Sequence, residues 1–359
     1  MPSGRGRRRV TLQTIADDVG VSRMTVSNAF SRPDQLSATL RATILARAEE
    51  LGYVGPDPAA RALARGTTGA IGVLLTQSMA SVFSGEHSVE FFSAVAQELA
   101  PTGLAVTLLP SYGSRDVVPA RDVPLDGALI YAAPDNAPAM DWLVRRRLPL
   151  VFVDRPAVSG SATVTLDERE AARQGAQHLL DLGHVRVGVL TQAFDGPHGL
   201  LAGPHEASGD SVSRGRVEGW FATLEAGGAH GVLAQVRDNS VEAGREAGRL
   251  LLDGVDRPTA VLCFSDEMAA GVLQAAREMG LTVPDDVSVV GFDDAGRARR
   301  TTPPLTTIRQ DVTDKGRRAA ATLLDAIALH RAGSAEQPAD VVLGTELVVR
   351  GSTAPPALR

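Results

Sequence analysis

The pattern of apolar and polar positions in residues 10–52 predicts three short helices that share one small core. Apolar side chains recur at helical spacing in each segment. They are Leu12, Ile15, Ala16 and Val19, then Val26, Ala29 and Phe30, then Leu40, Ile44, Ala48 and Leu51. Gly20 directly follows the first segment, where a left-handed residue commonly ends a helix. Ser22 and Ser37 precede the other two segments, and a serine hydroxyl is a good helix N-cap.

The second predicted helix has a polar outer face, which is typical of a helix-turn-helix DNA reader. We expect Arg23, Met24 and Asn28 to contact base edges, because arginine pairs with guanine and asparagine with adenine. Met24 offers an apolar contact only. Residues suited to phosphate contact, without reading sequence, are Ser22, Thr25 and Ser27. The alternative is an ordinary three-helix bundle with a solvated face.

About 290 residues of alternating strand and helix pattern follow, and they predict a body of the doubly wound α/β class. Seven apolar, β-branched runs are separated by helix-like stretches. They are Ala70–Leu75, Leu104–Leu109, Gly127–Tyr131, Leu150–Val153, Val185–Leu190, Ala260–Phe264 and Val287–Gly291. No run approaches the roughly 18 apolar residues of a membrane span, so we expect no membrane partner.

Charge divides the chain between its two parts. Residues 1–66 hold ten arginines and six carboxylates, a net charge of +4, while the whole chain carries −6 and the remainder −10. A basic head and an acidic body suit phosphate contact at one end only. The chain has one lysine, Lys315, so part of the arginine content reflects a compositional bias. Residues 1–9 are expected to form a disordered basic arm.

Other chemistry is sparse. The single cysteine, Cys263, excludes an internal disulfide and is expected to be buried packing in a cytoplasmic protein whose N-terminus lacks an apolar signal core. The sequence has no phosphate-binding Gly-Lys loop and no Gly-x-Ser-x-Gly elbow, and no cofactor is expected. His198 and His205 lack a cysteine partner for zinc. An enzyme of small-molecule metabolism carrying a DNA-binding head remains the alternative to a regulator.

Two stretches resemble the LacI/GalR family of bacterial repressors. They are TLQTIADDVGVSRMTVSNAF, similar to the family's reading head, and LGYVGPDPAARALARGTTGAIGV, similar to its hinge and the entry to its effector domain. The resemblance covers nearly the full length. Gly55 is a one-residue insertion relative to the family pattern, and Asp57 replaces the usual asparagine.

The hinge assignment also has a physical basis. Asp57 can cap a helix and Pro58 suits its first position. A helix over 59–65 is too short to be stable alone in water, so we expect it to fold on DNA. The resemblance implies that Leu63, with Ala60 beside it, wedges open a central base step in the minor groove. The alternative for Leu63 is a core leucine.

The resemblance further implies two lobes, similar to periplasmic sugar-binding proteins, with an effector in the cleft between them and about three chain crossings. Arg216 in SVSRGRVEGW and Asp293 in VVGFDD match the family's effector-facing positions, and a buried arginine and aspartate can bind polyol hydroxyls. In VLCFSDEMAAG, Ser265 and Asp266 are expected at a strand end. The alternative to effector contact is an interlobe salt bridge for Arg216 and Asp293, and a helix cap for Asp266. Further pocket candidates are Phe83, Tyr131, Asp154 and Asn239.

We therefore expect an all-α helix-turn-helix head, a hinge and a periplasmic-binding-protein-like α/β body of two doubly wound lobes. The predicted bounds are 10–56 for the head, 57–66 for the hinge and 70–350 for the body. The N-lobe is expected over about 70–164 and 296–330, and the C-lobe over about 165–295 and 338–350. The segment 194–211 is a candidate lid, and Trp220 is expected on the inner face of its helix.

The functional hypothesis is a homodimeric regulator, most simply a repressor, bound to a pseudo-palindromic operator in double-stranded DNA. A small sugar-like effector in the cleft would control operator affinity, as inducer or as co-repressor. The tail GSTAPPALR has no heptads, which favours a dimer over a coiled-coil tetramer.

Overall fold

The computed structural model describes residues 10–55, 62, 66–75, 85–110, 118–131 and 137–357. The chain forms two compact units, Met1–Gly69 and Ala70–Arg359, which are called the head and the body below. The predicted hinge residues Asp57, Pro58, Ala60 and Leu63, the arm 1–9 and the pocket candidate Phe83 lie outside the described residues. Among the described residues, no helix is long and apolar enough to cross a membrane.

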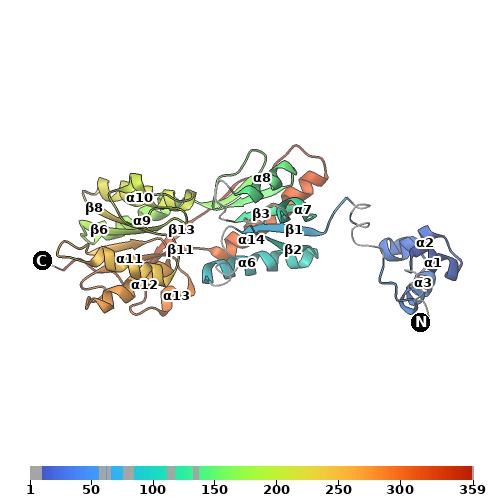
Figure 1. Cartoon of the computed structure of the whole chain (residues 1–359), viewed down its shortest axis with the longest axis horizontal. Coiled ribbons are helices and arrows are strands. Elements are labelled where there is room, and N and C mark those ends of the chain that lie inside the picture. Colours follow the sequence, from blue (N-terminus) through green and yellow to red (C-terminus); the bar gives the residue numbers. More distant parts are fainter. Residues whose placement is uncertain are drawn as a thin grey trace, which may run out of the picture. The chain divides into compact units, whose positions relative to one another are not determined.

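The head is a small helical domain (Figure 1). Its elements are α1 (Leu12–Val19), α2 (Arg23–Ser31), a 3-10 turn (Pro33–Gln35) and α3 (Ala38–Glu50). Gly20 ends α1 in the left-handed conformation with φ of 74°, and Ser22 and Ser37 cap α2 and α3 as predicted. All eleven predicted apolar positions belong to one core cluster, whose fully buried members are Ile15, Ala16, Val26, Ala29, Ile44 and Ala48. The helix-turn-helix prediction is confirmed.

The first lobe of the body is a parallel sheet in the order β12-β5-β4-β3-β1-β2, as far as the described residues show. Its strands are β1 (Ala70–Leu75), β2 (Ala105–Pro110), β3 (Gly127–Tyr131), β4 (Leu150–Val153), β5 (Ala162–Leu166) and β12 (Val341–Leu343). Its helices are α6 (Glu86–Leu99), α7 (Pro119–Asp122), α8 (Pro138–Arg145) and α14 (Val312–Arg331). Helices α6 and α14 cover one face and α7 and α8 the other (Figure 1).

The second lobe is a mixed sheet in the order β13-β11-β10-β9-β6-β8-β7, with β13 and β7 antiparallel at its edges. Its strands are β6 (Arg186–Gln192), β7 (Gly199–Leu201), β8 (His230–Val236), β9 (Ala260–Cys263), β10 (Ser288–Asp293), β11 (Thr306–Gln310) and β13 (Thr345–Val348). Its helices are α9 (Glu168–Asp181), α10 (Ser211–Ala226), α11 (Val241–Leu252), α12 (Asp266–Glu278) and α13 (Gly296–Arg300). All seven predicted strands are present, within two residues of their predicted bounds.

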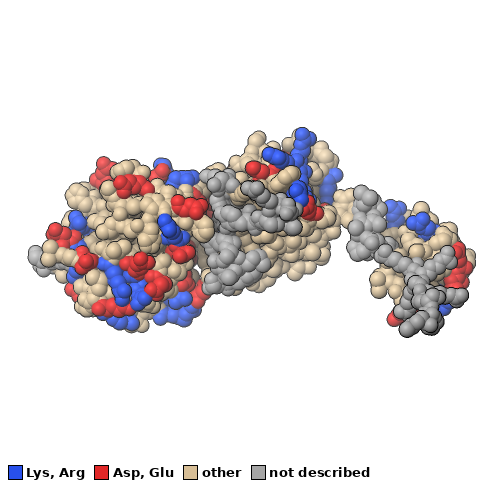
Figure 2. All heavy atoms as spheres, viewed as in Figure 1, with Lys and Arg blue, Asp and Glu red and all other residues tan. Residues whose placement is uncertain are grey.

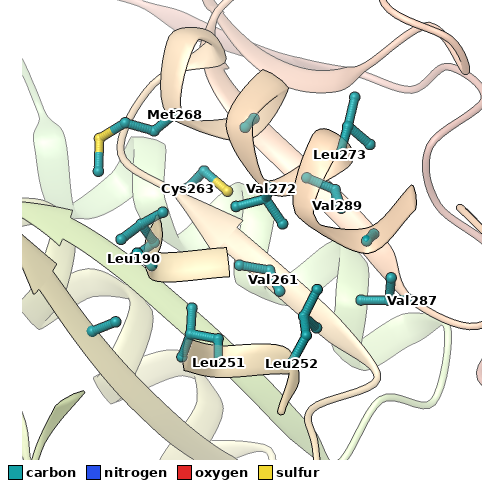
Figure 3. Close-up of a cluster of buried hydrophobic side chains, with 14 of the residues drawn as sticks. Leu190, Leu251, Leu252, Val261, Cys263, Met268, Val272, Leu273, Val287 and Val289 are labelled. Atoms are coloured by element: carbon teal, nitrogen blue, oxygen red, sulfur yellow. The ribbon is translucent and has the colours of Figure 1, made fainter. Parts of the chain in front are cut away.

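Separate hydrophobic clusters fill the two faces of this second sheet, as a doubly wound fold requires. Side chains from α11 and α12 pack on one face with Leu190, Val261 and Val289 of the strands (Figure 3). On the other face, α9 and α10 pack with Val187 and Val290, and Trp220 is buried there as predicted. Cys263 is buried in the first of these clusters.

Glycines allow the paired helices to lie close together. A Cβ atom on Gly244 of α11 would lie 2.2 Å from the Met268 carbonyl oxygen, and one on Gly271 of α12 would lie 2.1 Å from that of Val241. In the other pair, a Cβ on Gly219 of α10 would lie 2.5 Å from the Arg169 carbonyl oxygen. Since such distances are far below van der Waals contact, these positions must lack a side chain.

The chain crosses between the lobes after β5, after β11 and after β12, three times in the described residues. The predicted lobe bounds are wrong at the later crossings. Residues 296–310 belong to the second lobe, because α13 packs on α12 and β11 pairs with β10. Residues 341–343 return to the first sheet beside β5. Strand β11 was not predicted from its sequence, TTIRQ, because two of its buried positions are threonines and the segment therefore lacks a run of apolar residues.

The predicted lid, residues 194–211, is part of the second sheet instead. Its β7 pairs with β8. The buried Gln235 amide donates to the Pro197 carbonyl at 2.9 Å and accepts from the Ser208 amide at 3.0 Å. These bonds tie both ends of the segment to β8, so nothing here supports a lid.

Candidate functional site

The outer face of α2 presents the predicted DNA-contacting side chains. Met24 is 68% exposed, and Arg23 and Ser22 are exposed beside it. Asn28 is partly buried and donates from Nδ2 to Gln35 Oε1 at 3.0 Å. That bond uses one hydrogen of Nδ2 and orients the amide, whose Oδ1 and second Nδ2 hydrogen can still contact a base edge.

Two of the predicted phosphate contacts are linked to each other. The Ser22 Oγ accepts from the Thr25 amide at 3.0 Å and lies 2.8 Å from the Thr25 Oγ1. The N-terminus of α2 is therefore fixed by its own hydroxyls, as expected for a helix that must be held rigid to enter a groove. Ser27 lies one turn further along the same helix and is partly buried.

Most of the positive charge of the head lies in its flanking segments. Residues 10–55 contain four arginines and five carboxylates, while residues 1–9 contribute four arginines and residues 57–66 two. Within the folded part, Arg47 pairs with Asp18 and with Glu50, and the hydrogen bond from Arg47 holds the pKa of Asp18 below its usual range. Attraction to phosphate in this sequence is thus concentrated beside the helices of the head.

In the body, a chain of polar contacts joins the two lobes. The Lys315 ammonium on α14 of the first lobe donates to both carboxylate oxygens of Asp154 at 2.8 Å. Its third bond, at 2.6 Å, reaches the Gln310 Oε1 at the end of β11 in the second lobe. The Gln310 Nε2 donates in turn to Asp293 Oδ1 at 2.6 Å. Lys315 is 1% exposed, so this chain of contacts is buried.

Backbone conformation supports the two aspartates at the strand ends. Asp154 directly follows β4 and has a φ of 55°. Asp293 is the last residue of β10 and has a φ of 109°. Residues other than glycine rarely adopt positive φ, and aspartate tolerates it better than most. The Asp154 carbonyl oxygen also accepts from Ser211 Oγ, at 3.2 Å, from the first turn of α10. Both side chains are thereby aimed at the junction of the lobes.

Arg216 on α10 is buried in a pair with Glu168. Its Nε donates to Glu168 Oε2 at 2.7 Å, and its Nη1 donates to the Phe264 carbonyl at 2.5 Å. The guanidinium stacks 3.4 Å from the ring centroid of Phe292. Glu168 Oε1 is buried without a hydrogen-bond partner, and burial raises the pKa of Glu168 against the opposing effect of Arg216. Arg216 and Glu168 both belong to the second lobe, so this ion pair is not the interlobe salt bridge considered as an alternative.

Ser265, Asp266 and Asn239 lie at the same end of the second sheet, but their polar atoms mostly bond to one another and to the backbone. Ser265 caps α12 and donates its hydroxyl to Asn239 Oδ1. Asp266 accepts from Thr307 Oγ1 at 2.6 Å and from the Ala295 amide at 2.9 Å. Burial raises the pKa of Asp266 well above its usual value. Asp266 thus ties α12 to β11, while Asn239 remains exposed.

Tyr131 and His87 contribute from the first lobe. Tyr131 ends β3, is 9% exposed, and stacks on Phe91 with ring centroids 4.5 Å apart. Burial raises the pKa of Tyr131, against a hydrogen bond with Ser88. The Nδ1 atom of His87, on α6, lies 3.9 Å from Asp293 Oδ1 across the junction of the lobes. Burial lowers the pKa of His87.

A cavity of about 160 Å³ opens where these groups meet, between α6 and the ends of β10 and β11. Asp293 is the predicted effector residue that lines this cavity. His87 and Gln310, which were not predicted, line it as well. His87, Glu168, Gln310 and Lys315 were absent from the residues predicted from sequence. The only available signal was Lys315, as the one lysine in the chain.

Charges elsewhere on the body are mixed rather than segregated. Figure 2 shows acidic and basic side chains interspersed on the visible face of the second lobe. Arg299, Arg309 and Arg350 converge on the buried carboxylate of Asp294, and of these residues Asp294, Arg299 and Arg309 line the cavity described above.

Comparison with known proteins matches both parts of the chain. Residues 11–55 match the model of bacterial regulatory proteins of the lacI family, and residues 176–353 match the periplasmic binding protein-like domain. The HTH-type transcriptional regulator Rv3575c of Mycobacterium tuberculosis is 38% identical over 363 residues, which is 98% of this chain and 99% of that protein.

Solved structures agree over similar lengths. The lac repressor dimer bound to operator and the anti-inducer ONPF has a TM-score of 0.75 and 26% identity, over 97% of this chain and 100% of that one. The complex of the transcriptional regulator CelR with cellobiose has a TM-score of 0.68 and 26% identity, over 96% and 100%. The alternative of an enzyme is set aside, because such relatives are named regulators. With a helix-turn-helix head and a two-lobed binding-protein body, the chain belongs to the lacI family of bacterial transcriptional regulators.

Proposed function

We propose that this regulator is a repressor that binds a pseudo-palindromic operator as a homodimer and responds to a small hydroxylated effector between its lobes. The observation that carries the proposal is the buried chain of contacts Asp154–Lys315–Gln310–Asp293, which joins the lobes at the strand ends. Ligands of open α/β sheets bind at the carboxyl ends of the strands. A ligand placed there would compete for these bonds and change how the lobes are held.

In the head, we assign sequence reading to Arg23, Met24 and Asn28, and phosphate contact to Ser22, Thr25 and Ser27. The exposed face of α2 and its fixed N-terminus support this assignment. The operator complex of the lac repressor, which is similar to this chain, supports double-stranded DNA as the partner.

In the body, we assign effector contact to Arg216, Asp293, Asp154 and Ser265, with Tyr131 and Asn239 at the margin. The cellobiose complex of CelR supports a sugar-like ligand. Asp266 is assigned a supporting role, because it is 1% exposed and its carboxylate joins α12 to Thr307 of β11 and to the Ala295 amide, whereas Asp154 is partly exposed.

A homodimer is supported by the edge of the first sheet. Among the residues that the structure describes, strand β2 is at the edge of the sheet, with its Val106 42% exposed, and Val89 on the neighbouring α6 is 45% exposed. An uncovered edge strand with exposed apolar side chains favours pairing with another chain. The lac repressor structure that resembles this chain is a dimer.

For the hinge, we propose that Leu63 inserts at the central base step of the operator, on the sequence pattern described above. Leu63→Ala should then weaken operator binding by about 1–3 kcal/mol or more while leaving nonspecific DNA binding nearly unchanged. Gel-shift titrations against operator and scrambled duplexes measure both affinities. Equal losses on the two duplexes would remove the wedge role.

The experiment that tests the proposed function is selection of random duplex DNA by the purified full-length protein at two salt concentrations. Enrichment of a palindrome that persists at the higher salt supports specific operator binding, since nonspecific phosphate contact falls steeply with salt. Failure to enrich any sequence, with and without a metabolite extract present, would contradict the proposal.

A further inference from the structure

Two side-chain amides are joined at the outer face of α2. Asn28 donates from Nδ2 to the Oε1 of Gln35 at 3.0 Å. Gln35 belongs to the 3-10 turn between α2 and α3, and its side chain is exposed. The bond therefore connects a residue assigned to base reading with a surface residue outside the reading helix.

The backbone anchors both partners of this bond. The Asn28 carbonyl accepts from the Arg32 amide at 2.8 Å, where α2 ends. The Gln35 amide donates to the Arg32 carbonyl at 3.1 Å, and the next residue, Leu36, packs against the core cluster of the head. Because the fold holds the backbone on both sides, the side-chain bond restricts rotation of the Asn28 amide.

The orientation of an asparagine amide determines which base it can recognise. Adenine presents an acceptor, N7, and a donor, the N6 amino group, and it pairs with one amide hydrogen and the carbonyl oxygen of asparagine. An amide that rotates freely presents its oxygen and nitrogen in either order, and ordering it on binding costs conformational entropy. The bond to Gln35 uses one Nδ2 hydrogen and leaves Oδ1 and the other hydrogen for adenine.

We propose that Gln35 is a positioning residue for operator recognition, whose Oε1 holds the Asn28 amide in the orientation that reads adenine. The base preference assigned to Asn28 then depends on a residue of the turn as well as on α2. This inference rests on the proposed assignment of base contact to Asn28 and deepens it. The helical pattern of the sequence did not indicate Gln35, because Gln35 lies in a turn after the helix ends.

Binding of the full-length protein to single-base-pair variants of the selected operator tests this role. Each position is changed symmetrically in both half-sites, and Asn28→Ala identifies the base pair that Asn28 reads. The wild type is expected to prefer adenine there at least about tenfold, and Gln35→Ala to lose most of that preference. Preferences at the other base pairs should be unchanged in Gln35→Ala. A different preferred base at this position overturns the proposed orientation.

The conservative variant Gln35→Glu separates positioning from direct reading by the glutamine. A carboxylate still accepts from Asn28 Nδ2 but lacks the donors of the glutamine amide. Gln35→Glu should therefore keep the adenine preference, while its added negative charge weakens binding to all sequences alike. If Gln35→Glu loses the preference as Gln35→Ala does, Gln35 does not act by positioning Asn28, and the proposal is overturned.

The double variant Asn28→Ala with Gln35→Ala measures the coupling between the two amides. Once Asn28 is removed, loss of Gln35 should have no further effect on base preference at that position, so the two changes are non-additive. Additive losses overturn the proposal. Gln13→Ala is the matched control, because Gln13 is an exposed glutamine of α1 that bonds Asp17 at 2.7 Å, and it should leave the adenine preference unchanged.

The outcomes distinguish this inference from the proposed function. Gln35 variants that leave every base preference unchanged overturn the inference, while the operator selected by the wild type stands. Loss of preference at all positions in Gln35→Ala, with a lowered melting temperature, indicates a merely structural role and also overturns it. Unchanged preferences in Asn28→Ala overturn both the assignment of Asn28 and this inference. Failure of the wild type to select any sequence contradicts the proposed function itself.

Discussion

At the scale of single residues, the buried pair of Arg216 and Glu168 shows how the body holds a charge at its proposed ligand site. Desolvation makes an isolated buried charge costly, and a close partner with further hydrogen bonds offsets that cost. Arg216 has such bonds to Glu168 and to the Phe264 carbonyl, and its guanidinium lies over Phe292. The arginine is thus part of the packing of the second lobe as well as a candidate ligand contact.

Arg216→Ala should therefore destabilise the body by about 3–5 kcal/mol, because it leaves Glu168 buried without its cation. Chemical denaturation followed by tryptophan fluorescence measures the loss, since Trp220 is buried on the same helix.

The double variant Arg216→Ala with Glu168→Gln separates pairing from packing. Removing the orphaned charge should restore a large part of the stability, so the two changes should be strongly non-additive. Additive losses would mean that the arginine stabilises the lobe through packing on Phe292 alone.

At the scale of elements, the close approach of helix pairs gives the second lobe its dense core. In α11 and α12, Gly244 and Gly271 each face the backbone of the other helix, with no room for a Cβ. A helix otherwise rich in alanine can then lie directly on its neighbour, which buries apolar area on both sides of the contact. The same device joins α10 to α9 through Gly219, next to the buried Glu168.

Gly271→Ala should destabilise the protein by about 1–3 kcal/mol, because the new methyl group must displace backbone atoms of α11. Gly175→Ala is the matched control within α9, where a Cβ would find side-chain atoms no nearer than 3.4 Å. Thermal unfolding of both variants measures the difference. A melting temperature lowered equally in both would argue against the close-contact explanation.

At the scale of the whole molecule, allosteric control depends on what fixes the lobes to each other. The described interlobe contacts include polar ones, among them Lys315 to Gln310 and the Glu86 carboxylate to the Arg297 amide at 2.9 Å. They also include an apolar cluster, in which Leu166 of the first sheet packs with Phe292 and Ile308 of the second. A ligand that competes for the polar contacts can shift the equilibrium between lobe orientations, and typical coupling free energies for such shifts are about 1–3 kcal/mol. In a dimer, such a change would alter the separation of the two DNA-binding heads.

Val106→Arg should weaken the proposed dimer at least about tenfold, because it places a charge on the exposed edge strand that would have to be buried. Val342→Arg is the matched control: Val342 is 65% exposed on β12, at the opposite edge of the same sheet. Sedimentation equilibrium measures both. A dimer unaffected by Val106→Arg would place the interface elsewhere.

The sequence by itself determined the head, the class of the body and the family, because these depend on local patterns. Helical spacing, Gly20 and the two serine caps are properties of neighbouring residues, and so are the seven apolar strand runs. Position in a motif also suggested Arg216 and Asp293 as effector contacts, an assignment that stays a prediction. None of these inferences required knowing which residues meet across the fold.

Only the tertiary structure decided which residues lie beside the candidate site residues. Asp154 and Lys315 are 161 positions apart, and Arg216 and Glu168 are 48 apart, so no local pattern connects them. The sequence therefore missed Lys315, Gln310 and Glu168, and it assigned β11 to the wrong lobe. Charge pairing depends on distance in space and on burial, and both are set when the strand ends of two lobes are brought together.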